Sequence, residues 1–469
     1  VESKNTKESR RNMKKIKAPL DPGFFPLSLA YEQYREQVDA CADSIRFAVR
    51  IQRAEQLYSS FSMDILPPGR NDADTLHLLD RLVKSLLWIR GGYRIITSGS
   101  IMVHEHLLAA YREGGARAFD ADFMSTVYER PFEVCYEADA DSLAASMESA
   151  NSIGKHLNGC RIGFDAGGSD RKVSAVMDGK TLYSEEVVWH PKVTADPDYH
   201  YQGILSAFQT AAAHLPRVDG IGVSSAGVYI DNKAMVASLF LKVPKELYQS
   251  KVKNIYIRAA KEIGDIPLLV ANDGDVTALA GAMSLGVGRV LGIAMGTSQA
   301  GGYVDEQMRI MGWLNELAFV PVDMNEHAMV DEWSGDIGCG VKYFSQDAVI
   351  KLAPAAGIDL SAADTPAEKL KIVQREMEAG NPKAAEIYET IGVYFAYAIA
   401  WYARFYDISL VLVMGRVSSG RGGDIFIKTA RETLNSAFPE LAKQITLSLP
   451  DEKARRVGQS VAAASLPEI

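Results

Sequence analysis

Two glycine-rich segments carry hydroxyl residues directly after stretches typical of β-strands. Ala-Gly-Gly-Ser follows the strand-like segment 161–165, which ends in Asp165, and Gly296-Thr297 follows the apolar run 290–295. A glycine turn lets backbone N–H groups approach phosphate oxygens without a Cβ in the way, and a nearby hydroxyl or carboxylate can bind phosphate or hydrated Mg²⁺. Both turns therefore indicate phosphate chemistry, although a tight hairpin also favours glycine for purely structural reasons.

A third candidate is the carboxylate of Asp273. Residues 267–271 form an apolar run typical of a strand, and a helical pattern begins at Val276. We expect Asp273 at a strand end beside a helix N-terminus, where an anion is stabilised and points away from the sheet. It could act there as a general base, or it could serve only as the N-cap of the helix.

The strand pattern around these residues occurs twice. In the first copy we expect strands over 161–165, 172–177 and 181–188, a hairpin turn at Asp178-Gly179, a helix over 201–215 and a strand over 220–224. In the second copy, strands are expected over 290–295, at Tyr303-Val304 and over 308–311. Each copy presents one glycine-rich turn, as two lobes that close on one polyphosphate would require.

The region before residue 159 carries no recognisable catalytic motif. The spacing of its apolar residues predicts helices over 29–61, 74–88, 101–112 and 141–157, with a short strand over 93–97. Residues 1–17 hold seven Lys or Arg and two Glu, which favours a flexible basic tail. Residues 18–158 are therefore an α/β extension of unassigned role.

Five segments resemble, in order, the motifs of the ROK family (repressors, uncharacterised reading frames and kinases) of the actin-like ATPase and sugar kinase superfamily. Residues 165–169 resemble its first phosphate motif, Asp-x-Gly-Gly-Thr, and residues 267–281 resemble the segment that holds an Asn-Asp pair. The other three are 220–231, which resembles a Gly-x-Gly-x-Pro-Gly-Pro-Val-Asp segment, 296–298, which resembles the second phosphate motif, and 410–415, which resembles the adenosine strand. The resemblance begins near Arg161 and covers about two thirds of the chain.

The resemblance implies an α/β chain with a two-lobed, actin-like fold, in which a ribonuclease H-like unit is duplicated. The first lobe would comprise residues 159–285 and the second residues 286–469, preceded by the extension 18–158 and the tail 1–17. Such a fold implies ATP-dependent phosphoryl transfer to a hydroxyl of a sugar or a sugar-like molecule, with ATP and Mg²⁺ as cofactors.

The residue roles that the resemblance implies follow from the matched motifs. Asp273 would be the general base, Asn272 and Glu316 would bind substrate, and Asp165 would bind Mg²⁺ indirectly. The phosphates and the nucleotide would be bound by Asp165, Gly167, Gly168, Ser169, Gly296, Thr297 and Gly415. Either Arg171 or Lys172 could add a cation, but only one of them, because neighbouring side chains on a strand point to opposite faces.

The segment that reads sugar hydroxyls and binds a structural zinc in hexose kinases of this family departs from the family pattern. Glu316 is kept, but Phe319 replaces a His, Val341 replaces a Glu, and Cys339 is the one zinc-site thiol left, so no structural zinc is expected. Each lost polar contact weakens the free energy of sugar binding by about 1–3 kcal/mol. A ROK-type sugar sensor or transcriptional regulator with weak or no catalysis is therefore an alternative, and an ATPase that acts on a partner protein is a third.

Composition narrows these options. The chain has 469 residues, a net charge of −9 and 47% hydrophobic residues, which is typical of a multidomain globular protein. The negative charge argues against nucleic acid as a partner and against a membrane surface. There is neither a signal-peptide pattern nor an apolar run long enough to cross a bilayer, so we expect a cytoplasmic protein. We also expect a homo-oligomer, namely a dimer.

Overall fold

The computed structural model describes residues 15–139, 141–143, 145–148, 153–449 and 452–469. They belong to two compact units: unit 1, residues 1–149, 293–301 and 313–449, and unit 2, residues 150–292, 302–312 and 450–469. Most of the predicted basic tail lies outside the described residues. The boundaries proposed from the sequence remain a prediction, but the extension 18–149 shares unit 1 with most of the predicted second lobe.

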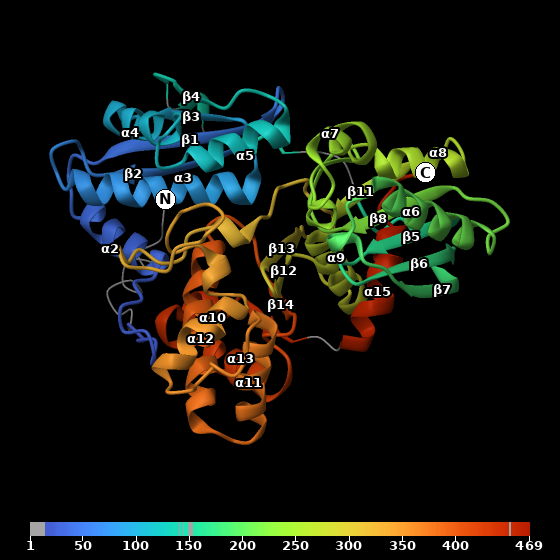
Figure 1. The fold of residues 1–469 in the computed structure, drawn as a ribbon. Helices are drawn as coiled ribbons and strands as arrows, with labels where there is room; N and C mark the ends of the chain where they lie inside the picture. Colours follow the sequence, from blue (N-terminus) through green and yellow to red (C-terminus); the bar gives the residue numbers. More distant parts are fainter. Residues whose placement is uncertain (1–14, 140, 144, 149–152, 450–451) are drawn as a thin grey trace. The chain divides into compact units, whose positions relative to one another are not determined.

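A five-stranded sheet organises unit 2 (Figure 1), and its strands have the order β11-β8-β5-β6-β7. Strands β11, β8 and β5 are parallel, whereas β6 is antiparallel to both β5 and β7. The strands are β5 (Cys160–Ala166), β6 (Asp170–Met177), β7 (Lys180–Val188), β8 (Gly220–Ser225) and β11 (Leu268–Asn272). This order and these directions are those of a ribonuclease H-like sheet, as predicted.

A second sheet repeats this order without the outer strand. It runs β13-β12-β14-β15, with β12 (Val290–Met295), β13 (Gln299–Val304), β14 (Leu410–Met414) and β15 (Thr446–Ser448). The repeat confirms the predicted duplication. The strand predicted over 308–311 is wrong: only Ile310 forms bridges, because Asp305 accepts the backbone N–H groups of Gln307 and Arg309 and closes a turn there.

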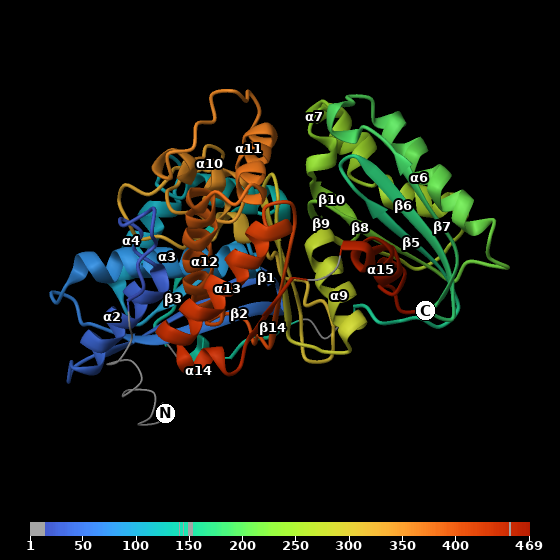
Figure 2. The same ribbon diagram turned by 90° about the horizontal axis from the view of Figure 1, so that it is seen from below.

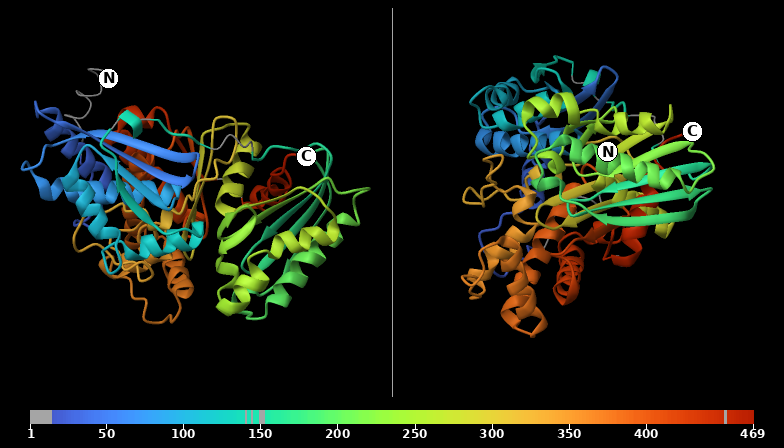
Figure 3. Two further views of the ribbon diagram at one scale, coloured as in Figure 1. Left: turned by 90° about the horizontal axis from the view of Figure 1, so that it is seen from above. Right: turned by 45° about the vertical axis from the view of Figure 1, so that its right-hand side comes forward.

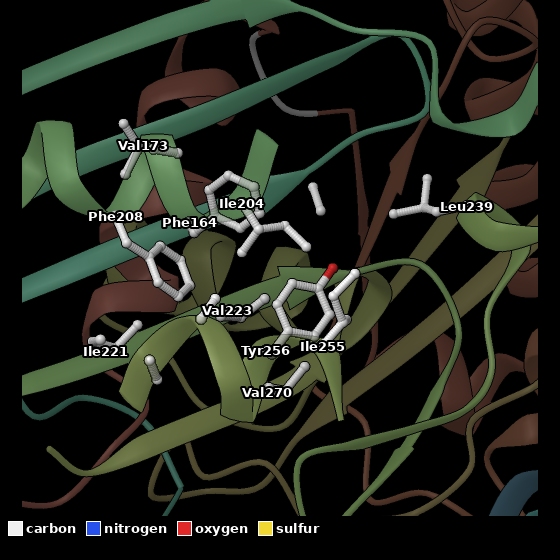
Figure 4. Close-up of a cluster of buried hydrophobic side chains, with 14 of the residues drawn as sticks. Phe164, Val173, Ile204, Phe208, Ile221, Val223, Leu239, Ile255, Tyr256 and Val270 are labelled. Atoms are coloured by element: carbon white, nitrogen blue, oxygen red, sulfur yellow. The ribbon is translucent and has the colours of Figure 1, made fainter. Parts of the chain in front are cut away.

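The two faces of the unit 2 sheet are covered differently. Helices α6 (Pro197–Ala212) and α8 (Ile255–Ile263) cover one face over an apolar core that includes Phe164, Phe208 and Tyr256 (Figure 4). Helices α9 (Asp273–Leu285) and α15 (Glu452–Ala464) pack on the other face (Figure 2). The shorter elements of unit 2 are η2 (Pro191–Val193), β9 (Val228–Ile230), β10 (Lys233–Val236), η3 (Ser238–Phe240), α7 (Lys245–Leu247) and η4 (Tyr248–Val252).

Unit 1 contains a four-stranded sheet of order β2-β1-β3-β4 from the N-terminal region (Figure 3). Its strands are β1 (Ile45–Ala54), β2 (Leu57–Ile65), β3 (Arg94–Ser98) and β4 (Glu133–Tyr136), and the helices packed with them are α2 (Leu27–Asp39), α3 (Asp72–Arg90), α4 (Ile101–Tyr111) and α5 (Ala118–Tyr128). The remaining elements are η1 (Asp141–Leu143), η5 (Leu317–Phe319), η6 (Gly340–Lys342), α10 (Gln346–Ala355), α11 (Pro366–Glu378), α12 (Pro382–Tyr402), α13 (Gly420–Ala437) and α14 (Pro439–Ala442).

Two helix predictions in the N-terminal region are wrong. The helix expected over 29–61 ends at Asp39 and is followed by the β1–β2 hairpin, because Phe47, Val49 and Ile51 alternate with more polar residues and fit a strand period better. Of the helix expected over 141–157, the residues that the structure describes form only a 3₁₀ turn at Asp141–Leu143, and Met147 pairs with Tyr58 of β2 instead. Among the described residues, no helix is long and apolar enough to cross a membrane.

Candidate active site

Register places three candidate residues at one edge of the unit 2 sheet. Asp165 of β5 lies opposite Ser224 of β8, and the next residue of β8, Ser225, lies opposite Asn272 of β11. Because these three strands are parallel, their carboxyl ends meet at this edge, where ligands bind in α/β sheets. Asp273 follows Asn272 as the first residue of α9. The structure therefore brings Asp165, Asn272 and Asp273 together within one unit.

The Asp165 carboxylate is almost fully buried. Ser224 Oγ donates a hydrogen bond of 3.0 Å to Asp165 Oδ1, and Lys172 Nζ lies 3.9 Å from Asp165 Oδ2. Burial raises the pKa of Asp165 to about 6; Lys172 and Ser224 oppose this rise, and the neighbouring Asp273 and Asp170 add to it.

The raised pKa of Asp165 predicts an unusual pH dependence. Because the folded state holds this proton more tightly than the unfolded state, stability should fall as pH rises from about 4 to about 6. In metal-free buffer, we expect Asp165→Asn to raise the free energy of unfolding at pH 8 by about 2–3 kcal/mol and to have little effect at pH 4. Urea unfolding at both pH values measures this, and an equal effect at both would contradict it.

Of the neighbours Arg171 and Lys172, it is Lys172 that faces this edge. Its Nζ lies 2.6 Å from Asp170 Oδ1, whereas the Arg171 guanidinium bonds to the carbonyl of Gly203 and to Ser206 Oγ on α6. Only one of the two neighbours therefore reaches the candidate site, as strand alternation predicted.

The C-terminal helix α15 completes the setting of Asp165 and was not predicted. Its Gln459 Nε2 donates to Ser224 Oγ at 3.1 Å and lies 3.5 Å from the backbone carbonyl oxygen of Asp273. The helix approaches the sheet closely because Gly163 and Gly222 face it: a Cβ would lie 1.8 Å from the Ser460 carbonyl oxygen at Gly163, and 1.6 Å from the Ala463 carbonyl oxygen at Gly222. The alternate glycines in Arg-Ile-Gly-Phe-Asp and Gly-Ile-Gly-Val-Ser were the sequence signal for this close approach.

Replacing Gly222 by Ala is expected to push α15 from the sheet. The added methyl group has no space, so we expect a loss of about 1–3 kcal/mol in the free energy of unfolding. Gly458→Ala on α15 is the matched control, because its Cβ would meet no atom closer than Ala280 Cβ at 3.9 Å and alanine favours a helix. Urea unfolding of both variants checks this, and equal stabilities would contradict it.

The helix cap at α9 is Asn272 and not Asp273. Asn272 Oδ1 accepts the backbone N–H of Gly274 at 2.7 Å, and Asn272 Nδ2 donates to the carbonyl oxygen of Gly227 at 2.8 Å. Asp273 is half-buried, and its Oδ1 accepts the same Gly274 N–H at 3.0 Å. Burial raises the pKa of Asp273, while backbone N–H groups and Lys192 lower it. Asn272 therefore caps the helix. The buried Asp275 has a different partner, since it accepts the backbone N–H of Tyr303 at 3.0 Å.

The first glycine turn lies beside the same edge of the sheet. Gly167 is half-buried, and Gly168 and Ser169 are exposed. Trp189 Nε1 donates to the carbonyl oxygen of Gly167 at 2.7 Å, and the Trp189 backbone N–H donates to that of Ser169 at 3.1 Å. Two hydrogen bonds from Trp189, in the segment that follows β7, therefore fix the backbone of the turn.

A second group of predicted residues lies in unit 1. Gly296 and Thr297 follow β12, and Gly415 follows β14, the neighbouring strand. Gly415 has a φ of +103°, and a Cβ there would lie 2.2 Å from the Met295 carbonyl oxygen, so only glycine fits. The Thr297 side chain is exposed, and the Gly296 N–H donates to the Ser298 carbonyl oxygen at 3.0 Å.

Glu316 and Phe319 adjoin the N-terminal region, also in unit 1. The Glu316 backbone N–H donates to the carbonyl oxygen of Trp88, near the end of α3, at 3.1 Å. Phe319 is 4% exposed and its ring centroid lies 4.2 Å from that of Trp88. The rings that surround it, the aromatic cluster, are Trp88, Phe119, Phe123 and Trp333. Sequence reasoning left the extension unassigned, but its helices position the segment that carries Glu316.

The residues present fit a magnesium–nucleotide complex better than a free metal ion. Among the described residues, no group of three or more His, Cys, Asp or Glu could hold a metal. Mg²⁺ keeps several water ligands and is commonly bound by one or two carboxylates together with substrate phosphates. Asp165, a buried carboxylate at the sheet edge, fits that role.

Cys339 is buried beside Asp336, and burial raises its thiol pKa to about 12.

This chain is similar to solved structures of other proteins, but its sequence matches neither a family model nor a curated protein. The ROK hexokinase of Thermus thermophilus is 17% identical with a TM-score of 0.49, and the similarity covers 65% of this chain and 97% of that one. A ROK family glucokinase of Streptomyces griseus, solved with glucose and AMPPNP, is 22% identical with a TM-score of 0.48, covering 64% and 98%.

A transcriptional regulator is similar to this chain in structure to about the same degree as these two kinases. A ROK family transcriptional regulator, described as a homologue of the E. coli MLC protein, is 20% identical with a TM-score of 0.49, covering 66% of this chain and 79% of that one. Identities at this level do not transfer an activity. Over about two thirds of its length, the chain is similar in structure to ROK family sugar kinases and to a ROK family regulator.

Proposed function

We propose that the protein is an ATP- and Mg²⁺-dependent phosphotransferase that acts on a hydroxyl group of a sugar or a sugar-like polyol. The observation that carries this proposal is the pair of acidic residues at one sheet edge. Asp165 is buried and hydrogen-bonded to Ser224, and Asp273 follows Asn272, the N-cap of α9. Phosphoryl transfer needs little covalent chemistry from the protein, so positioning and charge account for most of the catalysis.

Each residue has a distinct part in the proposed reaction. Asp165 would hold the hydrated Mg²⁺ of the nucleotide, which neutralises phosphate charge when bound. In unit 2, Ser169 and the amides of its turn would bind phosphate oxygens. In unit 1, Gly296, Thr297 and Gly415 would bind nucleotide. Asp273 would take the proton of the substrate hydroxyl, and the burial that raises its pKa makes it a stronger base. Asn272 and Glu316 would orient the substrate.

A coupled ADP-release assay tests the proposal. Sugars, sugar acids, amino sugars and polyols are each added with Mg²⁺–ATP, and the same mixtures without acceptor measure background hydrolysis. The proposal predicts release of ADP that depends on one acceptor class, with a phosphorylated acceptor as the product. ATP hydrolysis that no acceptor changes would favour an ATPase acting on a partner.

The aromatic cluster favours a second candidate, a sugar-sensing regulator of the ROK type. Phe319 is packed among Trp88, Phe119, Phe123 and Trp333, so this position offers no polar group to a sugar hydroxyl. A sensor would bind sugar without turnover. Acceptor binding by calorimetry in the absence of ADP release, together with sequence-selective and salt-dependent gel shifts on genomic DNA, would support the regulator and overturn the kinase.

A further inference from the structure

The segment after β7 is fastened to the first glycine turn. Trp189 donates two hydrogen bonds to the turn, to the carbonyl oxygens of Gly167 and Ser169, and its ring is buried against Phe164. Two residues later, the carbonyl oxygen of Pro191 lies 3.0 Å from Nε2 of His200, which is fully buried on α6. The backbone of Pro191–Val193 is therefore held in place from both sides.

This fixed segment places Lys192 over the glycine turn. A Cβ at Gly168 would lie 2.7 Å from Lys192 Cε and 3.0 Å from Lys192 Nζ. The lysine side chain is exposed and passes over Gly168 because that residue has no side chain. Because Gly168 has no Cβ, the lysine can approach the turn as closely as a phosphate could.

The charges around the turn leave this ammonium group available for an anion. Lys172, the other cation at the sheet edge, lies 2.6 Å from Asp170 and 3.9 Å from Asp165. Within the described part of the chain, Lys192 makes no hydrogen bond or ion pair. Its charge does act on Asp273, whose pKa burial raises and Lys192 lowers. The ammonium group therefore lies over the glycine turn, which follows β5 at the sheet edge that carries Asp165 and Asn272.

We propose that Lys192 is a catalytic residue that binds the transferring phosphoryl group between the first glycine turn and Asp273. The inference rests on the proposed function and adds a residue to it. In the reaction, the acceptor hydroxyl loses its proton to Asp273 and forms a new P–O bond, while the bond between the γ-phosphorus and the β,γ-bridging oxygen breaks and ADP leaves. Lys192 donates hydrogen bonds to the non-bridging oxygens throughout, so its own bonds do not change.

Three variants test the proposal in the full-length protein. Lys192→Ala removes the charge, Lys192→Arg keeps it, and Lys261→Ala on α8 removes another exposed lysine of unit 2 as the control. We expect Lys192→Ala to lower kcat/KM for ATP by ~10²–10³-fold, Lys192→Arg to recover at least tenfold of this loss, and the control to change little. Because Lys192 is exposed, all three should unfold at the wild-type temperature.

A binding measurement separates this inference from the proposed function. Inorganic tripolyphosphate, titrated with Mg²⁺ into each protein by calorimetry, probes the phosphate site without an acceptor or turnover. We expect at least tenfold weaker binding to Lys192→Ala and wild-type binding to Lys261→Ala. If no acceptor supports ADP release but this difference holds, the kinase proposal fails and the phosphate role of Lys192 stands. Equal binding by wild type and Lys192→Ala, or no binding by wild type, would overturn the inference.

Discussion

Replacing Asp273 by Asn is expected to lower kcat by ~10²–10⁴-fold, the usual contribution of a positioned general base. Asn has nearly the same shape and cannot accept the hydroxyl proton. Its amide Oδ1 can still accept the Gly274 N–H that Asp273 accepts at 3.0 Å, so the start of α9 should be kept. Nucleotide affinity should stay within a few-fold of wild type, because the loss concerns the reaction step. Steady-state ADP release and nucleotide titration measure the two quantities.

Asp265→Asn is a matched control for this variant, since Asp265 is exposed and precedes the opposite end of β11. Its kcat should equal that of wild type. In wild type, kcat/KM should fall as pH drops through the pKa of Asp273, because only the ionised carboxylate accepts a proton, and burial moves this acid limb above the usual range for aspartate. Turnover of Asp273→Asn within threefold of wild type would remove Asp273 from the role of base.

Asp336→Asn is expected to reduce the free energy of unfolding by about 3–5 kcal/mol, because it leaves buried cations without their common partner. Asp336 Oδ2 lies 2.7 Å from Arg81 NH1, 2.8 Å from Lys84 Nζ and 2.8 Å from Arg117 NH1. All three cations are less than 9% exposed. Among the described residues, the ion pairs that remain for these cations are Arg117–Asp80 and Lys84–Asp120.

Urea unfolding of Asp336→Asn and of Asp424→Asn, an exposed residue of α13, measures this effect. The three cations hold the pKa of Asp336 well below its usual range, so its stabilising effect should be present above about pH 4 and be lost as pH falls further. Adding Lys84→Met to Asp336→Asn should cost less than the sum of the two single changes, because it removes one unpaired buried cation. A cost of Asp336→Asn below 1 kcal/mol would show that the network is not needed for stability.

Local patterns were sufficient to predict the five strands of the main unit 2 sheet and the position of Asp273 between a strand and a helix, but not the short strands β9 and β10. The alternation in 172–177 and the Asp178-Gly179 turn, with φ of +49° and +79°, specify a hairpin within a few residues. The Asn-Asp pair between an apolar run and a helical pattern likewise specifies a strand end and a helix start. Such features depend on neighbouring residues, so one sequence suffices to predict them.

Other parts of the site depend on residues far apart in the chain. Gln459 reaches Ser224, and Trp88 packs on Phe319, only because the tertiary fold brings them together. Nothing in the sequence around Lys192 predicts its approach to Gly168, because that approach depends on the contacts of Trp189 and Pro191 with the glycine turn and with His200. The helix expected over 29–61 failed for a local reason. Ile45, Ala48 and Val49 fit a helical period, but Phe47, Val49 and Ile51 share one buried face at the period of two that a strand requires.

The place of α15 in the sequence has a consequence for folding. Strand β5 is made about 300 residues before Ser460 and Ala463, whose carbonyl oxygens come close to its Gly163 and to Gly222 of β8. Contacts over so long a separation slow folding, because a large loop must close before they form. During synthesis, the face of unit 2 that carries Asp165 thus lacks its covering helix until residues 452–464 leave the ribosome. A chain released before that point would expose this face and would be a target for chaperones and proteases.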